Sequence, residues 1–208
     1  MRAPNQHNTL GYLIAGGRAT RMGGVNKAAI LFCREPMGAR IIRSLKSQCA
    51  QVWVSANRDP ETFEHFGAAK VLPDVIEGSV GPLGGLDALA QERLPDGIEW
   101  VLTAPCDVPL YPHNLLAFFT EHFAQHEGKL FVVEAESKRH NTIALIHVSL
   151  LESVREFVER GDRKVGIWMH AHHAHACEWN EDADVFTNVN DLNELRDLEV
   201  MHREGWII

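Results

Sequence analysis

A glycine-rich segment with three cations follows the first apolar run and has the composition of a phosphate site. Residues 13–27 read L-I-A-G-G-R-A-T-R-M-G-G-V-N-K. Small residues let backbone N–H groups approach an anion, and the charges of Arg21 and Lys27 can neutralise it. The segment has neither the Gly-Lys-Ser/Thr ending of a P-loop nor the G-x-G-x-x-G of dinucleotide-binding proteins. A flexible hairpin with surface cations is the alternative, but α/β folds bind phosphate after the first strand, so we expect a phosphate site.

Acidic and amide side chains follow three later apolar runs. Asp74 follows a short run, Asp107 follows a longer one, and Asn188 and Asn190 follow a late one. Ligands of open α/β sheets bind outside the carboxyl ends of the strands, so these side chains are candidates for the same site. Two prolines flank Asp107 and fix its turn, which suits a ligand of Mg²⁺, a hard cation that prefers oxygen. The alternative is that Asp107 merely caps the next helix.

A second glycine cluster, G-P-L-G-G at 81–85, lies at the start of a predicted helix. Free N–H groups at a helix start can face an anion or a nucleobase. Equally, glycines in a helix allow it to pack closely on a sheet. The sequence does not separate the two interpretations.

The elements that must position these residues alternate between strands and helices. Strands are predicted at 9–15, 28–32, 51–56, 70–72, 98–104, 130–135, 142–147, 174–178 and 186–189, and helices at 37–49, from Pro82 to 93, and from Pro112 onward. This order predicts an α/β fold with a mainly parallel, doubly wound sheet in three αβα layers, forming one domain over 1–208.

Capping signals predict two further helices. S-L-L-E at 149–152 has the pattern of a capping box, and Gly161 lies just past the expected end of that helix. D-L-N-E at 191–194 repeats the pattern and opens the last helix, whose buried stripe begins at Leu192.

Composition excludes several classes of protein. The chain has 208 residues, 45% hydrophobic and 23% charged, with a net charge of −8. Such an acidic chain has no overall positive field that would recruit nucleic acid. Its four cysteines form no C-x-x-C pair, its first residues are not a signal peptide, and no apolar run is long enough to cross a membrane. We therefore expect a cytoplasmic protein with neither a nucleic-acid nor a membrane partner.

The run H-A-H-H-A-H at 170–175 could bind a transition metal, because imidazoles are common metal ligands. A strand would place His173 and His175 on one face. Since no carboxylate or cysteine lies at a recognisable ligand spacing, surface histidines on a sheet edge are the expected interpretation.

Five motifs occur in a fixed order between Leu13 and Leu192: the glycine-rich segment, V-S-A-N-R, G-P-L-G-G-L, C-D-V-P and F-T-N-V-N-D-L. Together they resemble the molybdenum cofactor guanylyltransferases, which join GMP from GTP to molybdopterin and release pyrophosphate. The resemblance implies a Rossmann-like nucleotidyltransferase fold with a nucleotide-binding half at about 9–110 and an acceptor-binding half at about 111–208. It also implies Mg²⁺ as cofactor, GTP and molybdopterin as substrates, and transient contact with enzymes that supply or receive the pterin.

The resemblance also implies roles for particular residues. The catalytic residues would be Arg21, Lys27 and Asp107, with Asp107 as the metal ligand. The nucleotide would contact Ile14, Ala15, Gly16, Gly17, Lys27, Ser55, Asp74 and Asp107. The acceptor would contact Asn188, Asn190, Arg163 and Lys164. Three positions depart from the family pattern, with Asn26 in place of an aspartate, Ser55 in place of an asparagine and Asn141 in place of a proline.

The implied reaction is attack by a phosphate oxygen of molybdopterin on the α-phosphorus of GTP. That oxygen is already nucleophilic, so the reaction needs positioning and charge stabilisation rather than a Ser-His or Cys-His pair. Three alternatives stay open: a cytidylyltransferase for the same pterin, a sugar-phosphate nucleotidyltransferase, and a non-catalytic carrier of nucleotide or pterin. G-P-L-G-G favours the guanylyl branch, and pyrophosphate release would separate an enzyme from a carrier.

Overall fold

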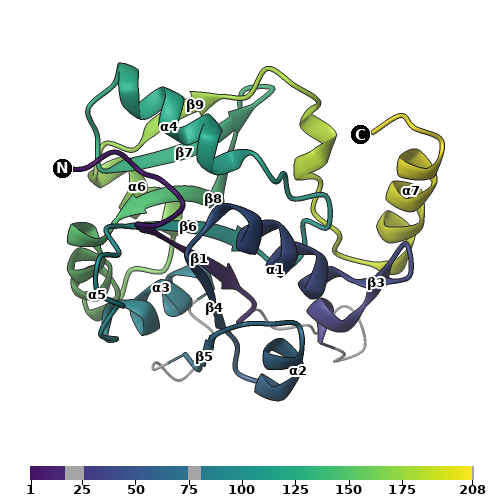
Figure 1. Cartoon of the computed structure of the whole chain (residues 1–208), viewed down its shortest axis with the longest axis horizontal. Helices are drawn as coiled ribbons and strands as arrows, with labels where there is room; N and C mark the ends of the chain where they lie inside the picture. Colours follow the sequence, from purple (N-terminus) through teal and green to yellow (C-terminus); the bar gives the residue numbers. More distant parts are fainter. Residues whose placement is uncertain (17–25, 75–80, 208) are drawn as a thin grey trace.

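The computed structural model describes residues 1–16, 26–74 and 81–207 and contains a seven-stranded sheet in the order β5-β4-β1-β6-β8-β7-β9 (Figure 1). The strands are β1 (Thr9–Ile14), β4 (Gln51–Ser55), β5 (Lys70–Leu72), β6 (Trp100–Pro105), β7 (Leu130–Ala135), β8 (Lys138–His147) and β9 (His175–Glu178). β8 is antiparallel to both of its neighbours, and the other pairs are parallel. The predicted mainly parallel, doubly wound sheet is confirmed.

The strand order reverses between β1 and β6. From β1 the chain passes outward to β4 and β5, and then returns to place β6 on the other side of β1. In sheets of this kind a crevice opens at the carboxyl ends of the two strands where the order reverses. The ends of β1 and β6 are therefore where a ligand site is expected.

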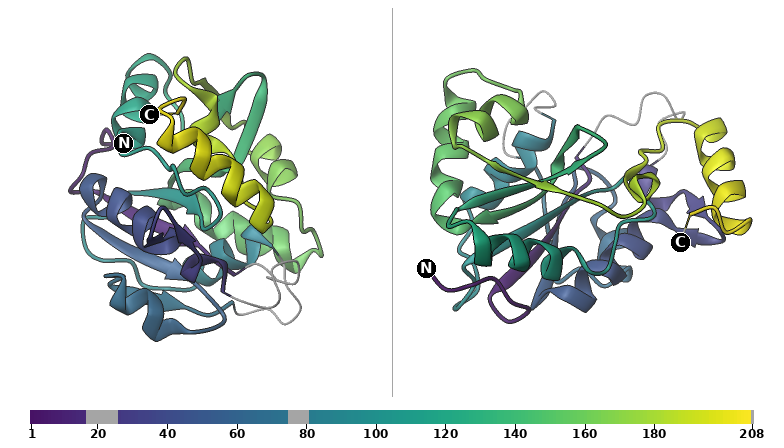
Figure 2. Two further views of the ribbon diagram at one scale, coloured as in Figure 1. Left: turned by 90° about the vertical axis from the view of Figure 1, so that its right-hand side faces the viewer. Right: turned by 90° about the horizontal axis from the view of Figure 1, so that it is seen from above.

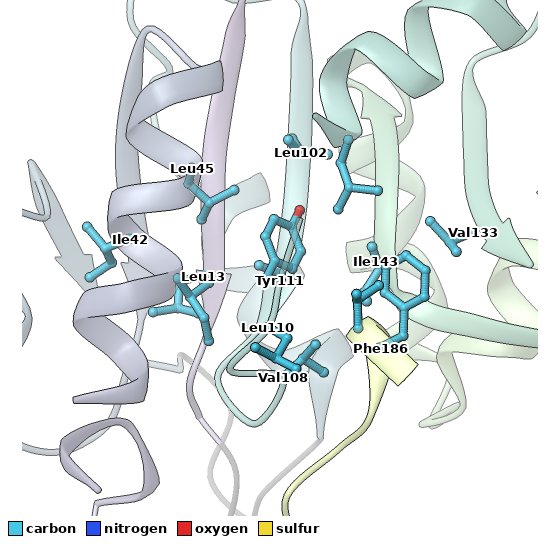
Figure 3. Close-up of a cluster of buried hydrophobic side chains, with 14 of the residues drawn as sticks. Leu13, Ile42, Leu45, Leu102, Val108, Leu110, Tyr111, Val133, Ile143 and Phe186 are labelled. Carbon is cyan, nitrogen blue, oxygen red and sulfur yellow. The ribbon is translucent and has the colours of Figure 1, made fainter. Parts of the chain in front are cut away.

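Helices cover both faces of the sheet and complete three layers (Figure 2). One face packs against α1 (Met37–Gln48), α2 (Pro60–His65) and α4 (Leu115–Gln125), and the other packs against α3 (Pro82–Ala90), α5 (Leu151–Glu159) and α6 (Val165–Ala171). Strand residues alternate between the layers, since Leu13 belongs to the first core while Tyr12 and Ile14 belong to the second. Figure 3 shows the first core, where Leu13 lies beside Leu45 of α1 and Ile143 beside Phe186.

The last helix, α7 (Leu192–Arg203), lies beside the short hairpin of β2 (Leu31–Phe32) and β3 (Glu35–Pro36) (Figure 2). The backbone N–H of Cys33 donates to Glu199 of α7 at 2.5 Å, and the rings of Phe32 and His202 are 5.6 Å apart. These contacts connect the end of the chain to the segment that follows Lys27.

Most predicted strands and helices are confirmed, and four details are wrong. The segment 28–32 is a strand only at Leu31–Phe32, because 27–29 forms a 3-10 helix capped by Asn26. The segment 186–189 is not a strand, because 183–186 forms a 3-10 helix (Ala183–Phe186) and the following backbone bonds to the turn of Asp107. The fourth helix begins at Leu115 rather than at Pro112. Leu192 is 55% exposed, because the buried stripe of α7 consists of Leu195 and Leu198.

The capping predictions have different outcomes. The carboxylate of Asp191 accepts from the backbone N–H groups of Asn193 and Glu194, as predicted for the start of α7. Ser149 instead lies in a 3-10 helix (Val148–Leu150), where its hydroxyl is 2.9 Å from Nδ1 of His147, so α5 begins without a side-chain cap. Among the described residues, no helix is both long and apolar enough to cross a membrane.

Candidate functional site

A cavity of about 370 Å³ lies at the carboxyl ends of β1, β4 and β6. Its lining residues come from eight separate stretches of the chain and are Ile14, Ala15, Gly16, Asn26, Lys27, Ala56, Asn57, Arg58, Phe63, Gly81, Pro82, Pro105, Cys106, Asp107, Thr142 and Asn188. The volume is in the range of small-molecule sites, and the lining mixes apolar surface with two cations and one carboxylate. The position agrees with the crevice expected where the strand order reverses.

Backbone hydrogen bonds hold the floor of the cavity in place. The N–H of Ala15 donates to the carbonyl of Ser55 at 2.8 Å, and the N–H of Cys106 donates to the carbonyl of Ile14 at 3.2 Å. The ladder between β1 and its two neighbours therefore extends to the end of each strand. Ala15 is therefore held by a hydrogen bond that continues the pairing of the sheet.

Asp74 lies behind the cavity wall and organises the residues around it. Its carboxylate accepts from the hydroxyl of Ser55 at 3.1 Å and from Nδ2 of Asn57 at 2.8 Å, while its N–H donates to Oδ1 of Asn57 at 2.7 Å. A Cβ at Gly16 would lie 2.9 Å from an oxygen of Asp74, so only glycine fits there without a shift. Asp74 and Ser55 are not among the lining residues, whereas Asn57 and Gly16 are.

Lys27 and Asp107 face each other across the cavity. The Nζ of Lys27 is 3.6 Å from Oδ2 of Asp107 and donates to the carbonyl of Val189 at 3.1 Å. Nδ2 of Asn188 donates to Oδ1 of Asp107 at 2.9 Å, and Oδ1 of Asn190 is 3.4 Å from Nζ of Lys27. The N-V-N segment therefore contacts the cation and the carboxylate that the sequence predicted as catalytic.

Asn26 has a local partner that suits an amide. Its Oδ1 accepts from the N–H of Ala28 and caps the 3-10 helix Lys27–Ala29, while its Nδ2 is a donor 3.4 Å from Oδ2 of Asp59. An aspartate at position 26 would place two carboxylates in that contact, with no donor between them. Asn26 is thus consistent with Asp59 in this chain.

The two interpretations of the second glycine cluster apply to different residues. Gly81 has φ of 64°, a conformation that favours glycine, and it lines the cavity beside Pro82. Gly85 lies inside α3, where a Cβ would be 2.7 Å from the hydroxyl oxygen of Ser55. The cluster therefore serves both the cavity and the packing of α3 on the sheet.

Replacing Gly85 by alanine is expected to lower the free energy of unfolding by about 1–2 kcal/mol. The added methyl group overpacks the contact with Ser55, which costs more than the gain of about 1 kcal/mol from helix propensity. Thermal unfolding would measure the change. Adding Ser55→Ala should recover part of the loss, and an unchanged or higher Tm for Gly85→Ala would contradict the packing argument.

Cys106 lines the cavity next to Asp107, but its thiol is not a nucleophile. Burial, together with the neighbouring Asp107 carboxylate, raises the pKa of Cys106 to about 12. The thiol is therefore protonated at neutral pH, whereas cysteine nucleophiles react as thiolates.

Cys106→Ser is accordingly expected to change kcat by less than about tenfold, or under about 1.4 kcal/mol of barrier. Steady-state turnover of the purified variant would measure this. A loss of several hundredfold with an unchanged Tm would overturn the assignment of Cys106 as a lining residue without a chemical role.

Two predicted site residues lie outside the described part of the chain, and the two described cations predicted for the acceptor do not line the cavity. Arg21 and Gly17 lie outside the described residues. Arg163 is exposed and donates from Nη1 to the carbonyl of Val158 at 2.8 Å, which satisfies the last turn of α5. Lys164 is also exposed and occupies the N-cap position of α6. Neither of these two cations lines the cavity.

Several lining residues were not assigned a role from the sequence, among them Arg58, Phe63 and Thr142. Arg58 places a second cation at the cavity, and the V-S-A-N-R motif was the signal that could have identified it. Phe63 comes from α2, a helix too short to give a clear periodic pattern. Thr142 lies on β8, between the residues Arg139 and Ala144 that pair with β7 and ahead of the residues that pair with β6.

The donor set around Asp107 fits a hard divalent cation. One carboxylate oxygen is held by Asn188, and the other is directed toward Lys27 at 3.6 Å, beyond hydrogen-bond distance. Mg²⁺ is usually bound by one or two carboxylates together with substrate phosphates, so a single anchored carboxylate in an open cavity suffices.

Comparison with known proteins identifies the family. The sequence profile of the MobA-like NTP transferase domain matches residues 11–176. The chain is also 32% identical over 185 residues to a molybdenum cofactor guanylyltransferase of Yersinia pseudotuberculosis, covering 89% of this chain and 92% of that protein. The chain belongs to the MobA-like NTP transferase family.

Solved structures share the fold of this MobA-like transferase. Molybdopterin-guanine dinucleotide biosynthesis protein A from Archaeoglobus fulgidus is 14% identical, with a TM-score of 0.71 and coverage of 94% of this chain and 99% of that one. A Mycobacterium tuberculosis protein in complex with manganese is 16% identical, with a TM-score of 0.67 and coverage of 93% and 98%. The resemblance noted from the five motifs and the nucleotidyltransferase fold that it implied are both confirmed.

Proposed function

We propose that this MobA-like transferase moves GMP from GTP to molybdopterin in its molybdenum-bearing form, giving the guanine dinucleotide cofactor and pyrophosphate. The observation that carries the proposal is the pairing of Lys27 with Asp107 across the cavity, at 3.6 Å, in a chain whose relatives are named molybdenum cofactor guanylyltransferases. A non-catalytic protein that only carried nucleotide would not need both the Lys27 ammonium and the Asp107 carboxylate.

The proposed step is an in-line displacement. A phosphate oxygen of molybdopterin forms a bond to the α-phosphorus of GTP, while the bond from that phosphorus to the bridging oxygen of the β-phosphate breaks. The electron pair of the broken bond leaves on pyrophosphate, so atoms and charge balance without a proton transfer from the protein. Catalysis then depends on alignment and on neutralising the charge of the leaving group.

Each group of lining residues has a proposed part in that step. The backbone at Ile14, Ala15 and Gly16 would hold the nucleotide, with Asp74 keeping the Gly16 and Asn57 segments in place from behind. Lys27, together with Arg21, would neutralise the phosphates of GTP. The segment 188–190 would keep Lys27 and Asp107 oriented before the substrates arrive.

Asp107 is the proposed ligand of the metal ion, and Mg²⁺ is the proposed ion. When bound to the triphosphate, Mg²⁺ would withdraw charge from the phosphate oxygens and so ease departure of pyrophosphate. The manganese complex of the Mycobacterium tuberculosis protein is consistent with a divalent cation in this fold.

We propose that the two halves of the chain bind different substrates. Residues of about 9–110 would bind the nucleotide, and residues of about 111–208 would supply the acceptor side through Thr142, Asn188 and Asn190. Arg163 and Lys164 would contact the acceptor where it extends beyond the cavity. The same proposal includes transient contact with enzymes that supply and receive the pterin.

Nucleotide selectivity followed by product analysis tests the proposal. Purified protein would be titrated with GTP, CTP, ATP and UTP, with and without Mg²⁺, and pyrophosphate release would then be measured with molybdopterin present. Mg²⁺-dependent preference for GTP and one pyrophosphate per pterin are expected. Preference for CTP would assign a cytidylyltransferase, turnover only with a sugar phosphate would assign a sugar-phosphate transferase, and binding without pyrophosphate would assign a carrier.

A further inference from the structure

Two histidines and a cysteine meet where α4 crosses the edge of the sheet. His122 lies on α4, while His175 and Cys177 lie on the edge strand β9. One ring nitrogen from each histidine and the Sγ of Cys177 all lie within 4.8 Å of one another. The two imidazoles are partly exposed and the thiol is buried.

The topology explains why these three side chains converge. His175 and Cys177 are two positions apart on a strand, so they point to the same face, and they pair in register with Phe131 and Val133 of β7. Phe131, Val133 and Cys177 belong to the core cluster that also contains Phe119 of α4. The face of β9 that carries His175 and Cys177 is therefore the face that α4, with His122, covers.

One buried ring nitrogen of the cluster lacks a hydrogen-bond partner among the described residues. Nδ1 of His122 is buried and has no hydrogen-bond partner among the residues that the structure describes. Sγ of Cys177 is 3.8 Å from the carbonyl of His175, a long contact even for sulfur. Buried polar atoms are normally paired, so an unpaired imidazole nitrogen beside a thiol calls for an explanation.

A fourth imidazole lies next to the cluster. His126 ends α4, and its ring centroid is 4.2 Å from that of His175 with the planes tilted by only 33°. His126 is the C-cap residue that follows α4, and its backbone is extended, with φ of −134° and ψ of 109°. His126 is thus available to complete a four-ligand site.

The protonation state of the two imidazoles is compatible with binding a metal ion. Burial, and then the neighbouring histidines, lower the pKa of both His122 and His175, so the rings are neutral and offer lone pairs at neutral pH. Burial raises the pKa of Cys177 to about 12, but a coordinated metal ion removes the proton from a thiol.

We propose that His122, His175 and Cys177 form a site for a borderline-soft transition metal ion of the Zn²⁺ class, with His126 beside it. Nitrogen and thiolate ligands select such ions over Mg²⁺, which prefers oxygen. Tetrahedral Zn²⁺ with bonds of about 2.0–2.3 Å brings ligand atoms to roughly 3.5 Å from each other. The ligand atoms lie up to 4.8 Å apart, and rotation of the two imidazole side chains would bring them to this spacing.

This site is separate from the cavity. β9 runs parallel to β7, and because β8 is antiparallel to both β7 and β6, β9 runs in the same direction as β6. His175 begins β9, so the cluster lies toward the amino-terminal edge of the sheet, while Asp107 follows the carboxyl end of β6. A bound ion would tie α4 to the edge strand, which otherwise has a single neighbour in the sheet.

Cobalt substitution tests the proposal with a readout that is independent of activity and of the proposed function. Metal-free full-length protein would be titrated with Co²⁺ in millimolar Mg²⁺, which keeps any oxygen site occupied. We expect one Co²⁺ per chain with the thiolate charge-transfer band and the intense visible bands of tetrahedral coordination. Zn²⁺ should then displace Co²⁺, and at about 100 times its Kd it should raise Tm by roughly 5–10 °C.

Variants locate the ion. Cys177→Ser should abolish the charge-transfer band, and His122→Ala or His175→Ala should weaken binding by more than about 100-fold, since even changes around a metal site cost about 10–100-fold. His170→Ala, an exposed histidine of the same run, is the matched control and should bind like the parent. Absence of the thiolate band in the parent protein, or its persistence in Cys177→Ser, would overturn the proposal. Circular dichroism of each metal-free variant would confirm that it is folded.

Discussion

Asp107→Ala will lower Mg²⁺-dependent kcat for pyrophosphate release by about 10³-fold, equivalent to about 4 kcal/mol of barrier. The reason is that Asp107 supplies the anchored carboxylate of the cavity, with one oxygen held by Asn188 and the other directed toward Lys27. Without it the metal–triphosphate complex loses its attachment to the protein. Steady-state pyrophosphate release over a range of Mg²⁺ concentrations would measure the effect.

Two further variants separate loss of chemistry from loss of structure. Asp107→Asn keeps the volume of the side chain and its contact with Asn188 but removes the charge, so it should be nearly as impaired as the alanine variant. Asp96→Ala removes a carboxylate that is 97% exposed and should behave like the parent protein. Full Mg²⁺-dependent turnover by Asp107→Ala would rule out Asp107 as the metal ligand.

Lys27→Gln will lower kcat/KM by about 10²–10³-fold, because it removes the described cation that faces Asp107 while keeping a hydrogen-bond donor. Glutamine can still reach toward the carbonyl of Val189, so the segment 188–190 should stay attached and Tm should change little. Isothermal titration with GTP would also report weaker binding of the triphosphate.

Lys129→Gln, at an exposed position away from the cavity, is the control for loss of one positive charge. If Lys27→Gln and Lys129→Gln retained equal kcat/KM, Lys27 would have no part in binding or transferring phosphate. A large fall in Tm for Lys27→Gln alone would instead indicate that its main contribution is to hold the segment 188–190.

The bounds of several strands and helices could be predicted from apolar runs, turn residues and helical periodicity. The apolar runs of β5 and β7 are bounded by turn residues, and the helical stripe of α1 faces one side, so their bounds could be read closely from the sequence. The segment 186–189 has a strand-like composition, but its backbone pairs with the turn of Asp107 instead of joining the sheet. A composition-based prediction cannot anticipate a partner so distant in the sequence.

The residues of the site that lie at strand ends could be predicted, but the contacts between distant side chains could not. Ile14, Gly16, Lys27 and Asp107 line the cavity as expected from strand ends and the glycine-rich segment. The position of Asp74 behind Gly16 depends on side-chain geometry that no spacing reveals. In the same way, the contact of His175 with a histidine on α4 explains why the histidine run could not be interpreted from its own neighbourhood, and the two-residue spacing to Cys177 was overlooked.

The attachment of residues 188–190 to Lys27 and Asp107 has a consequence for how the protein matures during synthesis. Every described strand of the main sheet lies between Thr9 and Glu178, so all of these strands are synthesised before the segment 188–190. The segment 188–190, which contacts Lys27 and Asp107, is synthesised afterwards, and so is α7, which contacts the β2–β3 hairpin. A nascent chain that already contains every described strand of the sheet therefore still lacks the contacts that hold Lys27 and Asp107.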